Sequence, residues 1–254
     1  MFALERQKKI TELLKEQGAV SVSKLALELG VTEETVRRDL EKLEKQEVLL
    51  RTHGGAVPVE EGNHELSLEK RKNKNIEAKT KLAKEAVKLI SSGDAIFIDA
   101  STTAFYLAKE LKNFKNITVV TNSMRVLAEL SGNFDIKLIS VGGMMSKNQS
   151  FVGSIAENNI RENYFVNKMF FSSRGITEGG ILESNEQECC IKQSIMQNCT
   201  DRFYLCDRTK IGRVGFVKLA DFEDINCIIT EKDAINKHFL ANLYELKVKV
   251  LEVV

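Results

Sequence analysis

The sequence Val31-Thr-Glu-Glu-Thr-Val-Arg-Arg-Asp-Leu40 has the pattern of a short amphipathic helix that follows a tight turn. Thr32 is a good N-cap, and the two glutamates after it lie where the helix dipole favours negative charge. Val36, Leu40 and Leu43 recur at i, i+4 and i+7, which predicts one buried stripe. We therefore expect the second helix of a helix-turn-helix.

The polar side of this helix carries two adjacent arginines. Thr35, Arg37 and Arg38 lie off the apolar stripe and are expected to face outward. A short helix with an apolar back and a basic front suits the major groove of DNA. Taken alone, the same pattern is more typical of an ordinary salt-bridged surface helix, so the interpretation depends on the flanking sequence.

The flanking segments complete a winged helix-turn-helix. Residues 4–17 predict a first helix, and Ser21 is expected to cap a second one. Residues 48–57 predict two short strands about a glycine turn. In this arrangement Arg51 and His53 belong to the wing, close to the phosphate backbone. For His53, a turn residue without any DNA contact is an equally good interpretation.

Composition predicts a protein with a sizeable core. The 254 residues are 43% hydrophobic, which suits one or two folded domains. The net charge is +1, and residues 1–56 carry as many acidic as basic side chains. DNA binding must therefore depend on the local placement of basic groups rather than on the overall field.

The five cysteines and three histidines do not form a metal-binding pattern. The number of cysteines is odd, they contain no Cys-x-x-Cys, and the histidines are scattered. Free thiols in a reducing compartment are the simpler interpretation. The sequence contains no signal peptide, and no apolar run approaches the ~20 residues needed to span a membrane. We expect a soluble, cytoplasmic protein without metal, cofactor or membrane partner.

Two segments with different patterns follow the wing. Residues 58–75 begin at the only proline, are polar and charged, and predict a linker that is partly helical from Leu66. This divides the chain into a DNA-binding domain, residues 1–57, and a second domain, residues 76–254.

In the second domain, amphipathic helices alternate with continuous apolar strands. The expected strands are 95–100, 117–122, 136–141, 168–173, 203–207, 226–230 and 248–253. The expected helices are 76–90, 102–111, 123–130, 154–161, 186–198 and 234–244. This alternation indicates an α/β fold of the Rossmann-like type, with a mostly parallel sheet covered on both faces.

Three consecutive strand ends carry groups that suit a ligand. In open parallel sheets, ligands bind beyond the carboxyl ends of the strands. Asp99-Ala-Ser-Thr-Thr103 offers hydroxyls and backbone N–H groups to a phosphate. Thr121-Asn-Ser123 is a second polar end, and Gly142-Gly143 lets backbone approach a ligand closely. One such loop is usually plain helix capping, but three together favour a pocket.

Both halves of the chain resemble the DeoR (deoxyribonucleoside-repressor) family of bacterial transcription regulators. Thr-Val-Arg-Arg-Asp-Leu at 35–40, Leu43-Glu44 and Arg51-Thr-His-Gly-Gly-Ala56 are similar to its DNA-binding signature. The three strand-end loops are similar to those of its effector domain. Asp207-Arg-Thr-Lys210 resembles the family's Asp-x-Ser/Thr-Lys, and Glu188 to Lys192 resembles its Glu-x-x-x-Lys helix.

The resemblance implies a fold shared with ribose-5-phosphate isomerase and coenzyme A transferases, and a phosphorylated sugar or polyol as effector. At Asn167 the family usually has an aspartate, so the charge is lost while a carbonyl oxygen remains. This leaves ligand specificity at that position open. Glu188 and Lys192 are one helical turn apart, and a simple surface ion pair is as good an interpretation as a site role.

We therefore predict a repressor of a sugar or polyol operon that binds double-stranded operator DNA as a homo-oligomer, a dimer or tetramer. The predicted DNA contacts are Ser21, Thr32, Glu33, Thr35, Arg37, Arg38, Arg51 and His53. The predicted effector contacts are Asp99, Ser101, Thr102, Thr103, Thr121, Asn122, Gly142, Gly143, Asp207 and Lys210.

Within the effector site, Ser101, Thr102, Thr103 and Lys210 are assigned to the phosphate. Asp99, Asn122 and Asp207 are assigned to the sugar hydroxyls. The main alternative is a sugar-phosphate isomerase-like enzyme, with Asp207 as base and Lys210 as its electrostatic partner. A scaffold that binds partners without a ligand is a third hypothesis.

Overall fold

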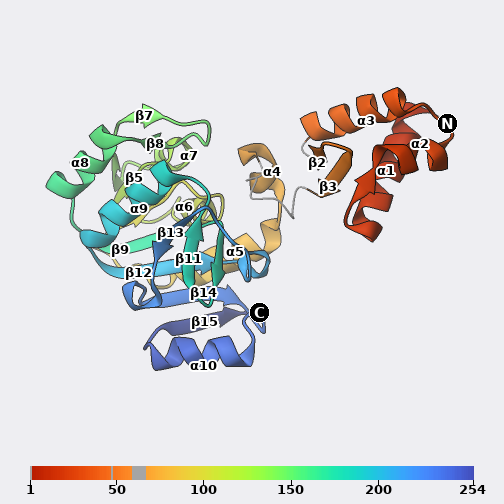
Figure 1. The fold of residues 1–254 in the computed structure, drawn as a ribbon. Helices are drawn as coiled ribbons and strands as arrows, with labels where there is room; N and C mark the ends of the chain where they lie inside the picture. Colours follow the sequence, from red (N-terminus) through yellow and green to blue (C-terminus); the bar gives the residue numbers. More distant parts are fainter. Residues whose placement is uncertain (1, 47, 59–66) are drawn as a thin grey trace. The chain divides into compact units, whose positions relative to one another are not determined.

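The computed structural model describes residues 2–46, 48–58 and 67–254. The chain divides into two compact units, Met1–Ser67 and Leu68–Val254, which we call the N-terminal and C-terminal units (Figure 1). Of the expected linker, residues 59–66 lie outside the described residues. Its later part forms helix α4 (Leu68–Asn73), which is grouped with the C-terminal unit.

The N-terminal unit has the three helices and the hairpin that its sequence predicts. The helices are α1 (Ala3–Gln17), α2 (Val22–Leu29) and α3 (Glu33–Lys45). The strands are β1 (Val20–Ser21), β2 (Leu49–Thr52) and β3 (Gly55–Pro58), paired in the order β1-β3-β2.

Side-chain caps and one apolar stripe define the helix-turn-helix. The Ser21 hydroxyl accepts from the backbone N–H of Lys24, and the Thr32 hydroxyl accepts from that of Thr35, both at 3.3 Å. Between the two helices, Gly30 has a φ of 64°, a conformation that costs glycine little. The predicted stripe is confirmed, because Val36, Leu40 and Leu43 are buried in the core of this unit.

The sequence interpretation missed the third strand of the wing. Strand β1 pairs antiparallel with β3, with Ser21 opposite Gly55. A Cβ at Gly55 would lie 1.9 Å from the carbonyl oxygen of Val20, so only glycine allows this approach. A two-residue strand gives no period-two pattern, which is why sequence alone did not predict it.

The C-terminal unit contains a seven-stranded parallel sheet, which confirms the predicted α/β fold. The strand order is β15-β14-β12-β9-β4-β5-β6. The strands are β4 (Ala95–Ile98), β5 (Ile117–Thr121), β6 (Ile136–Ser140), β9 (Val166–Phe171), β12 (Cys199–Cys206), β14 (Cys227–Glu231) and β15 (Lys249–Val253).

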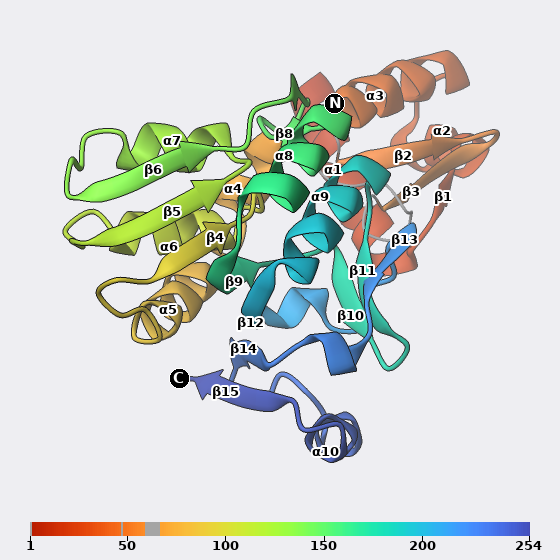
Figure 2. The ribbon, with the colours of Figure 1, turned by 90° about the vertical axis from the view of Figure 1, so that its left-hand side faces the viewer.

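Helices cover both faces of this sheet (Figures 1 and 2). One apolar cluster joins the sheet to α5 (Ile76–Val87), α6 (Ala104–Glu110) and α7 (Met124–Leu130). The other joins it to α8 (Ser154–Asn163), α9 (Glu186–Gln197) and α10 (Lys237–Glu245). Strand residues alternate between the clusters: Ile96 and Ile98 belong to the first, and Phe97 to the second.

Two small antiparallel sheets were not expected. One joins β10 (Gly175–Thr177), β11 (Gly180–Glu183) and β13 (Val217–Ala220), and the other joins β7 (Met144–Met145) and β8 (Phe151–Val152). These strands are short, so they lack the long apolar runs that predicted the main sheet. Strand β11 matters here because it carries Glu183 into the site.

The strand order changes direction between β4 and β9. From β4 the chain continues to β5 and β6 on one side, and then crosses to β9, β12, β14 and β15 on the other. Ligands of open α/β sheets bind at the carboxyl ends of the strands at such a point. Asn167 lies at the opposite edge, because its Oδ1 accepts from the N–H of Ala95, the first residue of β4, at 2.8 Å. Asn167 therefore supports strand pairing.

Candidate functional site

The outer face of α3 carries exposed ion pairs. Arg37 pairs with Glu33 at 2.6 Å, and Arg38 pairs with Glu34 at 3.3 Å. The arginine side chains are 51% and 74% exposed, as predicted. Exposed pairs of this kind contribute roughly 0–1 kcal/mol, so a DNA phosphate or base edge can replace the glutamates at small cost.

The other predicted DNA contacts surround this face. Thr32 and Thr35 place their hydroxyls 2.9 Å apart at the start of α3. On the wing, Arg51 and His53 are exposed, and the backbone N–H of Arg51 donates to Glu44 at 2.9 Å. These groups face solvent, as a DNA-binding surface requires.

Behind this face, α3 is tied to α1 by a buried carboxylate. Asp39 is 2% exposed, forms an ion pair with Arg6 and accepts from the side-chain amide of Gln7 at 2.9 Å. The Asp39 of the Arg-Arg-Asp motif is thus a structural residue, which the sequence interpretation did not foresee.

In the C-terminal unit, Asp99 orders the turn that follows β4 and links it to the residue after β9. Its Oδ1 accepts from the Ser101 backbone N–H at 3.1 Å and from the Ser101 hydroxyl at 2.6 Å. Its Oδ2 accepts from the N–H of Ser172 at 3.3 Å and pairs with Lys192 at 3.2 Å. The carboxylate of Asp99, which is 1% exposed, therefore accepts from four donors.

Two further residues that were predicted to contact the effector, Thr121 and Gly143, already have structural roles in the fold. The Thr121 hydroxyl donates to the carbonyl of Ile98 at 2.6 Å and accepts from the N–H of Ser123 at 3.0 Å, which ties β5 to β4. A Cβ at Gly143 would lie 2.8 Å from the Val152 carbonyl oxygen, so this glycine serves close packing. Gly142 has a φ of 67° and open space at the Cβ position.

Lys192 and Glu188 are buried inside the site, so the interpretation of a surface ion pair is wrong. Lys192 is 4% exposed, pairs with Glu183 and donates to the Ser172 carbonyl at 2.7 Å. Burial by itself lowers the pKa of Lys192, but the carboxylates of Glu183, Asp99 and Glu188 outweigh it and raise the pKa above its ordinary value. Lys192 is therefore protonated at neutral pH.

Glu188 lies near Lys192 but has different hydrogen-bond partners. It accepts a hydrogen bond from the Ser150 hydroxyl, and the side-chain amide of Asn122 lies 3.5 Å from its Oε2. Burial is the main cause that raises its pKa. By contrast, the pKa of Glu183 is lowered, because Lys192 outweighs the opposing effect of burial.

The loop after β12 adds Asp207 and Lys210 to the same edge. Asp207 is buried and accepts from the N–H of Thr209 at 3.1 Å and from the amide of Asn75 at 3.2 Å. Burial opposes ionisation of Asp207, but the charges of Lys210 and Lys79 and the hydrogen bonds from Thr209 lower its pKa overall. Lys210 donates to the carbonyl of Ser173, the residue that follows Ser172 beyond β9, at 2.7 Å.

Four basic side chains gather here, and we call them the cationic cluster: Arg71, Lys79, Arg125 and Lys210. Lys79 is 3% exposed, and its pKa is lowered to about 8. Burial is the largest cause, and Lys210, Arg71 and Arg125 act in the same direction, while Asp207 opposes them. Burial also lowers the pKa of Arg125, whose guanidinium lies 3.8 Å from the ring centre of Phe105.

Three buried polar atoms that follow strands β4 and β5 have no hydrogen-bond partner among the described residues. They are Thr103 Oγ1, Asn122 Oδ1 and Arg125 Nη1. Thr103 precedes α6, while Asn122 and Arg125 follow β5. Buried polar groups are normally satisfied, and a polar ligand is a frequent reason for exceptions at strand ends.

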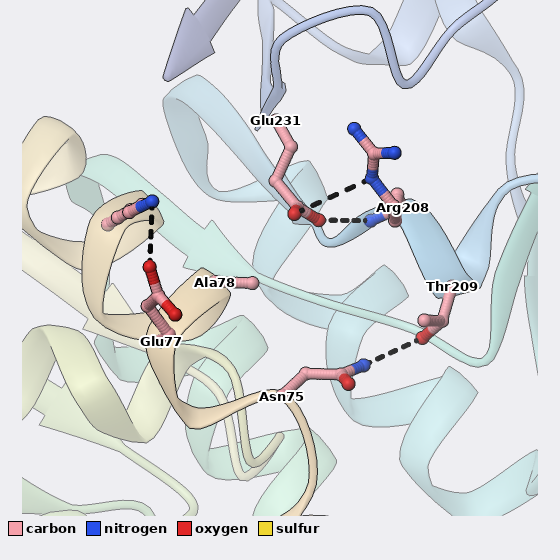
Figure 3. Close-up of a pocket in the computed structure, with 7 residues that line it drawn as sticks. Asn75, Glu77, Ala78, Arg208, Thr209 and Glu231 are labelled. Carbon is pink, nitrogen blue, oxygen red and sulfur yellow. Dashed lines mark hydrogen bonds and ion pairs between the residues drawn. The ribbon is translucent and has the colours of Figure 1, made fainter. Parts of the chain in front are cut away.

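A pocket of about 320 Å³ is lined by Arg208 and Thr209, which follow Asp207 in the chain (Figure 3). Asn75 and Thr209 line the pocket and also donate to Asp207, and they hydrogen-bond to each other at 3.0 Å. Its charged groups are paired: Lys81 with Glu77 at 2.9 Å and Arg208 with Glu231 at 3.6 Å. Because these charges are compensated, the cationic cluster is the better anion site.

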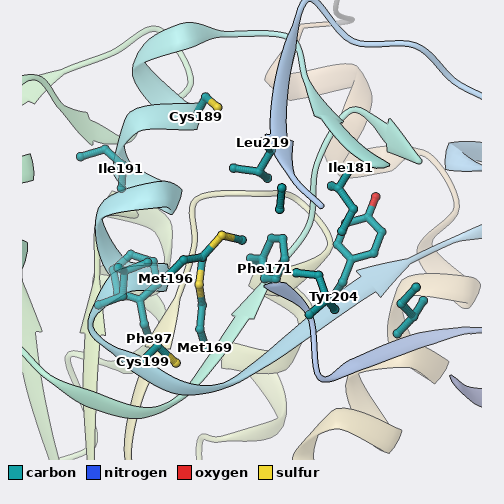
Figure 4. Packing of buried hydrophobic residues seen from close by; sticks show 14 of the residues in the cluster. Phe97, Met169, Phe171, Ile181, Cys189, Ile191, Met196, Cys199, Tyr204 and Leu219 are labelled. Atoms are coloured by element: carbon teal, nitrogen blue, oxygen red, sulfur yellow. The ribbon is translucent and has the colours of Figure 1, made fainter. Parts of the chain in front are cut away.

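The site rests on a closely packed apolar layer (Figure 4). Phe171 and Tyr204 pack with their ring centres 5.3 Å apart. The Tyr204 hydroxyl lies 2.8 Å from that of Ser173, so one core side chain also holds the loop after β9. The site loops are thereby fixed to a rigid sheet.

The sequence interpretation missed five site residues: Arg71, Lys79, Arg125, Ser150 and Glu183. Arg71 falls in the expected linker, and Lys79 falls on a helix with an ordinary charged pattern. Arg125 comes three residues after Asn122, so its position in the first turn after a strand end was the one available signal. Ser150 and Glu183 lie in the unexpected antiparallel segments.

The described parts of the chain show neither a metal-binding group of side chains nor a membrane-spanning helix. No group of three or more His, Cys, Asp or Glu side chains there is arranged to hold a metal ion. Nor is any described helix both long and apolar enough to cross a membrane.

Comparison with known proteins gives consistent matches over both units. The model of the DeoR-like helix-turn-helix domain matches residues 6–61, and that of the DeoR C terminal sensor domain matches residues 74–232. The HTH-type transcriptional regulator YulB of Bacillus subtilis is 39% identical, covering 100% of this chain and 98% of its own length.

Other relatives are repressors by name. The lactose phosphotransferase system repressor of Staphylococcus epidermidis is 31% identical and covers 93% of this chain and 95% of its own. The transcriptional repressor GlcR of Bacillus subtilis is 32% identical and covers 91% of this chain and 90% of its own length. Among solved structures, ribose 5-phosphate isomerase A from Methanocaldococcus jannaschii has a TM-score of 0.40 at 21% identity, covering 54% of this chain and 55% of its own.

Proposed function

The chain belongs to the DeoR family of helix-turn-helix transcription regulators, and we propose that it represses an operon for sugar or polyol use under the control of a phosphorylated sugar. Its relatives are regulators rather than enzymes, and several are named as repressors. The observation that carries the proposal is the cationic cluster, in which Arg125 has a buried nitrogen with no hydrogen-bond partner among the described residues.

The phosphate is assigned to the cationic cluster together with the loop before α6. The like charges of the four cations repel one another although Asp207, Glu69 and Glu129 offset part of the effect, and a phosphate dianion relieves that repulsion. The Thr103 hydroxyl and the Arg125 guanidinium each offer an unused hydrogen-bonding atom to it. Thr102, which is 5% exposed, borders the same loop. Lys210 adds the charge that the sequence already assigned to this anion.

The sugar hydroxyls are assigned to Asn122, Glu188 and Asp207. Asn122 has an unpartnered carbonyl oxygen that can accept from a hydroxyl. Glu188 lies against its amide, and Asp207 lies near Lys210 within the loop after β12. Asp99 already accepts four hydrogen bonds, so we now expect it to position the loop rather than to contact the sugar.

Three further features complete the proposal. The protein acts in the cytoplasm, where operator DNA and sugar phosphates occur together. It acts as a dimer or tetramer, because symmetric operators present two half-sites. It needs no metal or other cofactor, since a regulator requires only differential binding of its effector by two arrangements of the chain.

Calorimetry tests the proposal on the full chain with glucose 6-phosphate, ribose 5-phosphate, glycerol 3-phosphate and inorganic phosphate. Lys210→Ala and Thr102→Val are expected to weaken binding of the preferred compound by about tenfold or more. Both variants should keep ligand-free DNA affinity. Lys115→Ala is the matched control, because Lys115 is 77% exposed and precedes β5 at the opposite edge of the sheet.

The outcomes separate the hypotheses. Unchanged affinity in both variants would remove this pocket from consideration. Conversion of the sugar phosphate to an isomer would restore the enzyme hypothesis. A chain that binds none of the four compounds, and whose unfolding midpoint none of them raises, would favour the ligand-independent scaffold.

A further inference from the structure

Helix α4 is the first element of the C-terminal unit, and it follows the wing strand β3 along the chain. It has six residues, a length at which an isolated helix is not stable in water. Its conformation must therefore depend on the contacts that hold it to the rest of its unit. Those contacts decide where the chain leaves the C-terminal unit toward the DNA-binding unit.

The contacts that hold α4 include an apolar side chain and hydrogen bonds to its main chain and to Arg71. Leu68 is 7% exposed. The Lys79 ammonium donates to the carbonyl of Arg71, and the Tyr106 hydroxyl donates to the carbonyl of Lys72 at 3.3 Å. The Arg71 guanidinium donates to the side-chain carbonyl of Asn148 at 2.8 Å. The two main-chain contacts thus come from α5 and α6, the helices next to the proposed phosphate.

Two members of the cationic cluster are part of this attachment. Arg71 lies on α4 itself, and Lys79 is the donor to its main chain. The like charges of Arg71, Lys79 and Arg125 act against each other, while Glu69 of α4 and Asp207 offset part of this repulsion. A phosphate among them converts the same charges into attraction and holds α4 more tightly.

We propose that Arg71 is a ligand of the effector's anionic group, and that α4 is the element through which effector binding reaches the DNA-binding unit. The inference rests on the proposed function, because it uses the same anion site. It adds to that function a residue outside the loops of the sheet and a defined path for regulation. The helix that contacts the anion is also the first element of the C-terminal unit, so it is the one that follows the DNA-binding unit along the chain.

Hydrogen exchange on the full chain gives a direct test, with the four compounds named above as probes. The backbone amides of residues 68–73 should become more protected when the preferred sugar phosphate binds. Arg71→Gln should weaken its binding by about 10–100-fold, the loss expected for a charge-assisted hydrogen bond. Arg161→Gln, at an exposed arginine of α8, is the matched control.

Tyr106→Phe separates coupling from binding. This variant removes only the hydroxyl that donates to α4, so its affinity for the sugar phosphate should stay within about threefold of wild type. The ratio of DNA dissociation constants with and without the sugar phosphate should fall toward one, from the roughly 5–150-fold typical of allosteric coupling. Tyr244→Phe, at a 56% exposed tyrosine of α10, should leave that ratio unchanged.

The results distinguish the two levels of the proposal. If the wild-type chain binds none of the four compounds, the proposed function fails. If it binds one and its DNA affinity responds, but Arg71→Gln binds normally, Tyr106→Phe keeps the full ratio, or α4 gains no protection, the inference about α4 is wrong while the proposed function stands.

Discussion

Arg37 and Arg38 are held by glutamates on their own helix, and DNA must displace those glutamates before either arginine reaches a base or a phosphate. Such exposed pairs are weak, so breaking them costs little compared with what binding to DNA returns. Arg37→Ala with Arg38→Ala should weaken operator binding by about 1–3 kcal/mol for each base that an arginine reads, and should relax sequence preference. Fluorescence anisotropy with operator and scrambled DNA measures both effects.

The control for this prediction is Lys45→Ala. Lys45 is 75% exposed, lies in the last turn of α3 and is paired with Glu41 in the same way. Operator affinity that is unchanged in the double arginine variant would show that α3 does not dock as proposed.

Lys79 makes effector binding depend on pH. Its pKa of about 8, against an ordinary 10.5, means that the ligand-free protein loses this proton as the pH rises through 8. A phosphate is already a dianion above about pH 7. Affinity for the sugar phosphate should therefore fall between about pH 7 and pH 9, and calorimetry at several pH values measures the slope. Lys79→Arg, which stays charged, should flatten it.

The same pKa has a consequence for stability, with a defined sign. Between about pH 8 and pH 10.5 the unfolded chain binds more protons at Lys79 than the folded one. The contribution of Lys79 to the free energy of unfolding therefore rises with pH across this window.

The binding prediction has its own contrary outcome. If the affinity of the wild-type chain for the sugar phosphate does not change from about pH 7 to pH 9, Lys79 does not hold the anion.

At the scale of elements, the wing depends on the close approach of β1 and β3. Because a Cβ at Gly55 would lie 1.9 Å from Val20 oxygen, Gly55→Ala must separate the two strands. Overpacking of this kind typically costs about 1–3 kcal/mol. Chemical unfolding followed by circular dichroism should show this destabilisation, and operator affinity should fall as the wing moves.

Gly54→Ala is the matched control for the wing. Gly54 is the neighbouring residue, has open space at its Cβ position and does not adopt a positive φ. Its replacement should change stability by less than about 0.5 kcal/mol. Equal effects of the two substitutions would mean that the β1–β3 contact does not limit the stability of this unit.

At the scale of the whole molecule, we ask whether the effector-binding domain begins at residue 68 or at residue 76. The polar composition of residues 58–75 predicted that it begins at Ile76, whereas α4 contacts the site from residue 68 onward. A fragment 68–254 should bind the preferred sugar phosphate as the full chain does. A fragment 76–254 should bind it about tenfold or more weakly, because it lacks Arg71.

Thermal unfolding with and without the sugar phosphate, together with calorimetry, compares the two fragments. The ligand should raise the midpoint of fragment 68–254 more than that of fragment 76–254. Equal affinity in both fragments would show that α4 contributes nothing to the anion site.

Local features of this chain were predictable from its sequence. The stripe of Val36, Leu40 and Leu43 and the caps at Ser21 and Thr32 depend on residues within one or two helical turns. Continuous apolar runs likewise indicated the parallel sheet, because a strand covered on both faces needs apolar side chains in both directions. The signature residues were sufficient to suggest the family.

Tertiary structure alone decided which of these pieces meet. Strand order placed the ends of β4 and β9 together, which turned Asp99 into a saturated loop anchor and buried Lys192 among carboxylates. It also brought Arg71 and Lys79 to the same site from separate helices. Periodicity reports only which face of a segment is buried, whereas burial of charge and long-range pairing depend on neighbours that are far away in the chain.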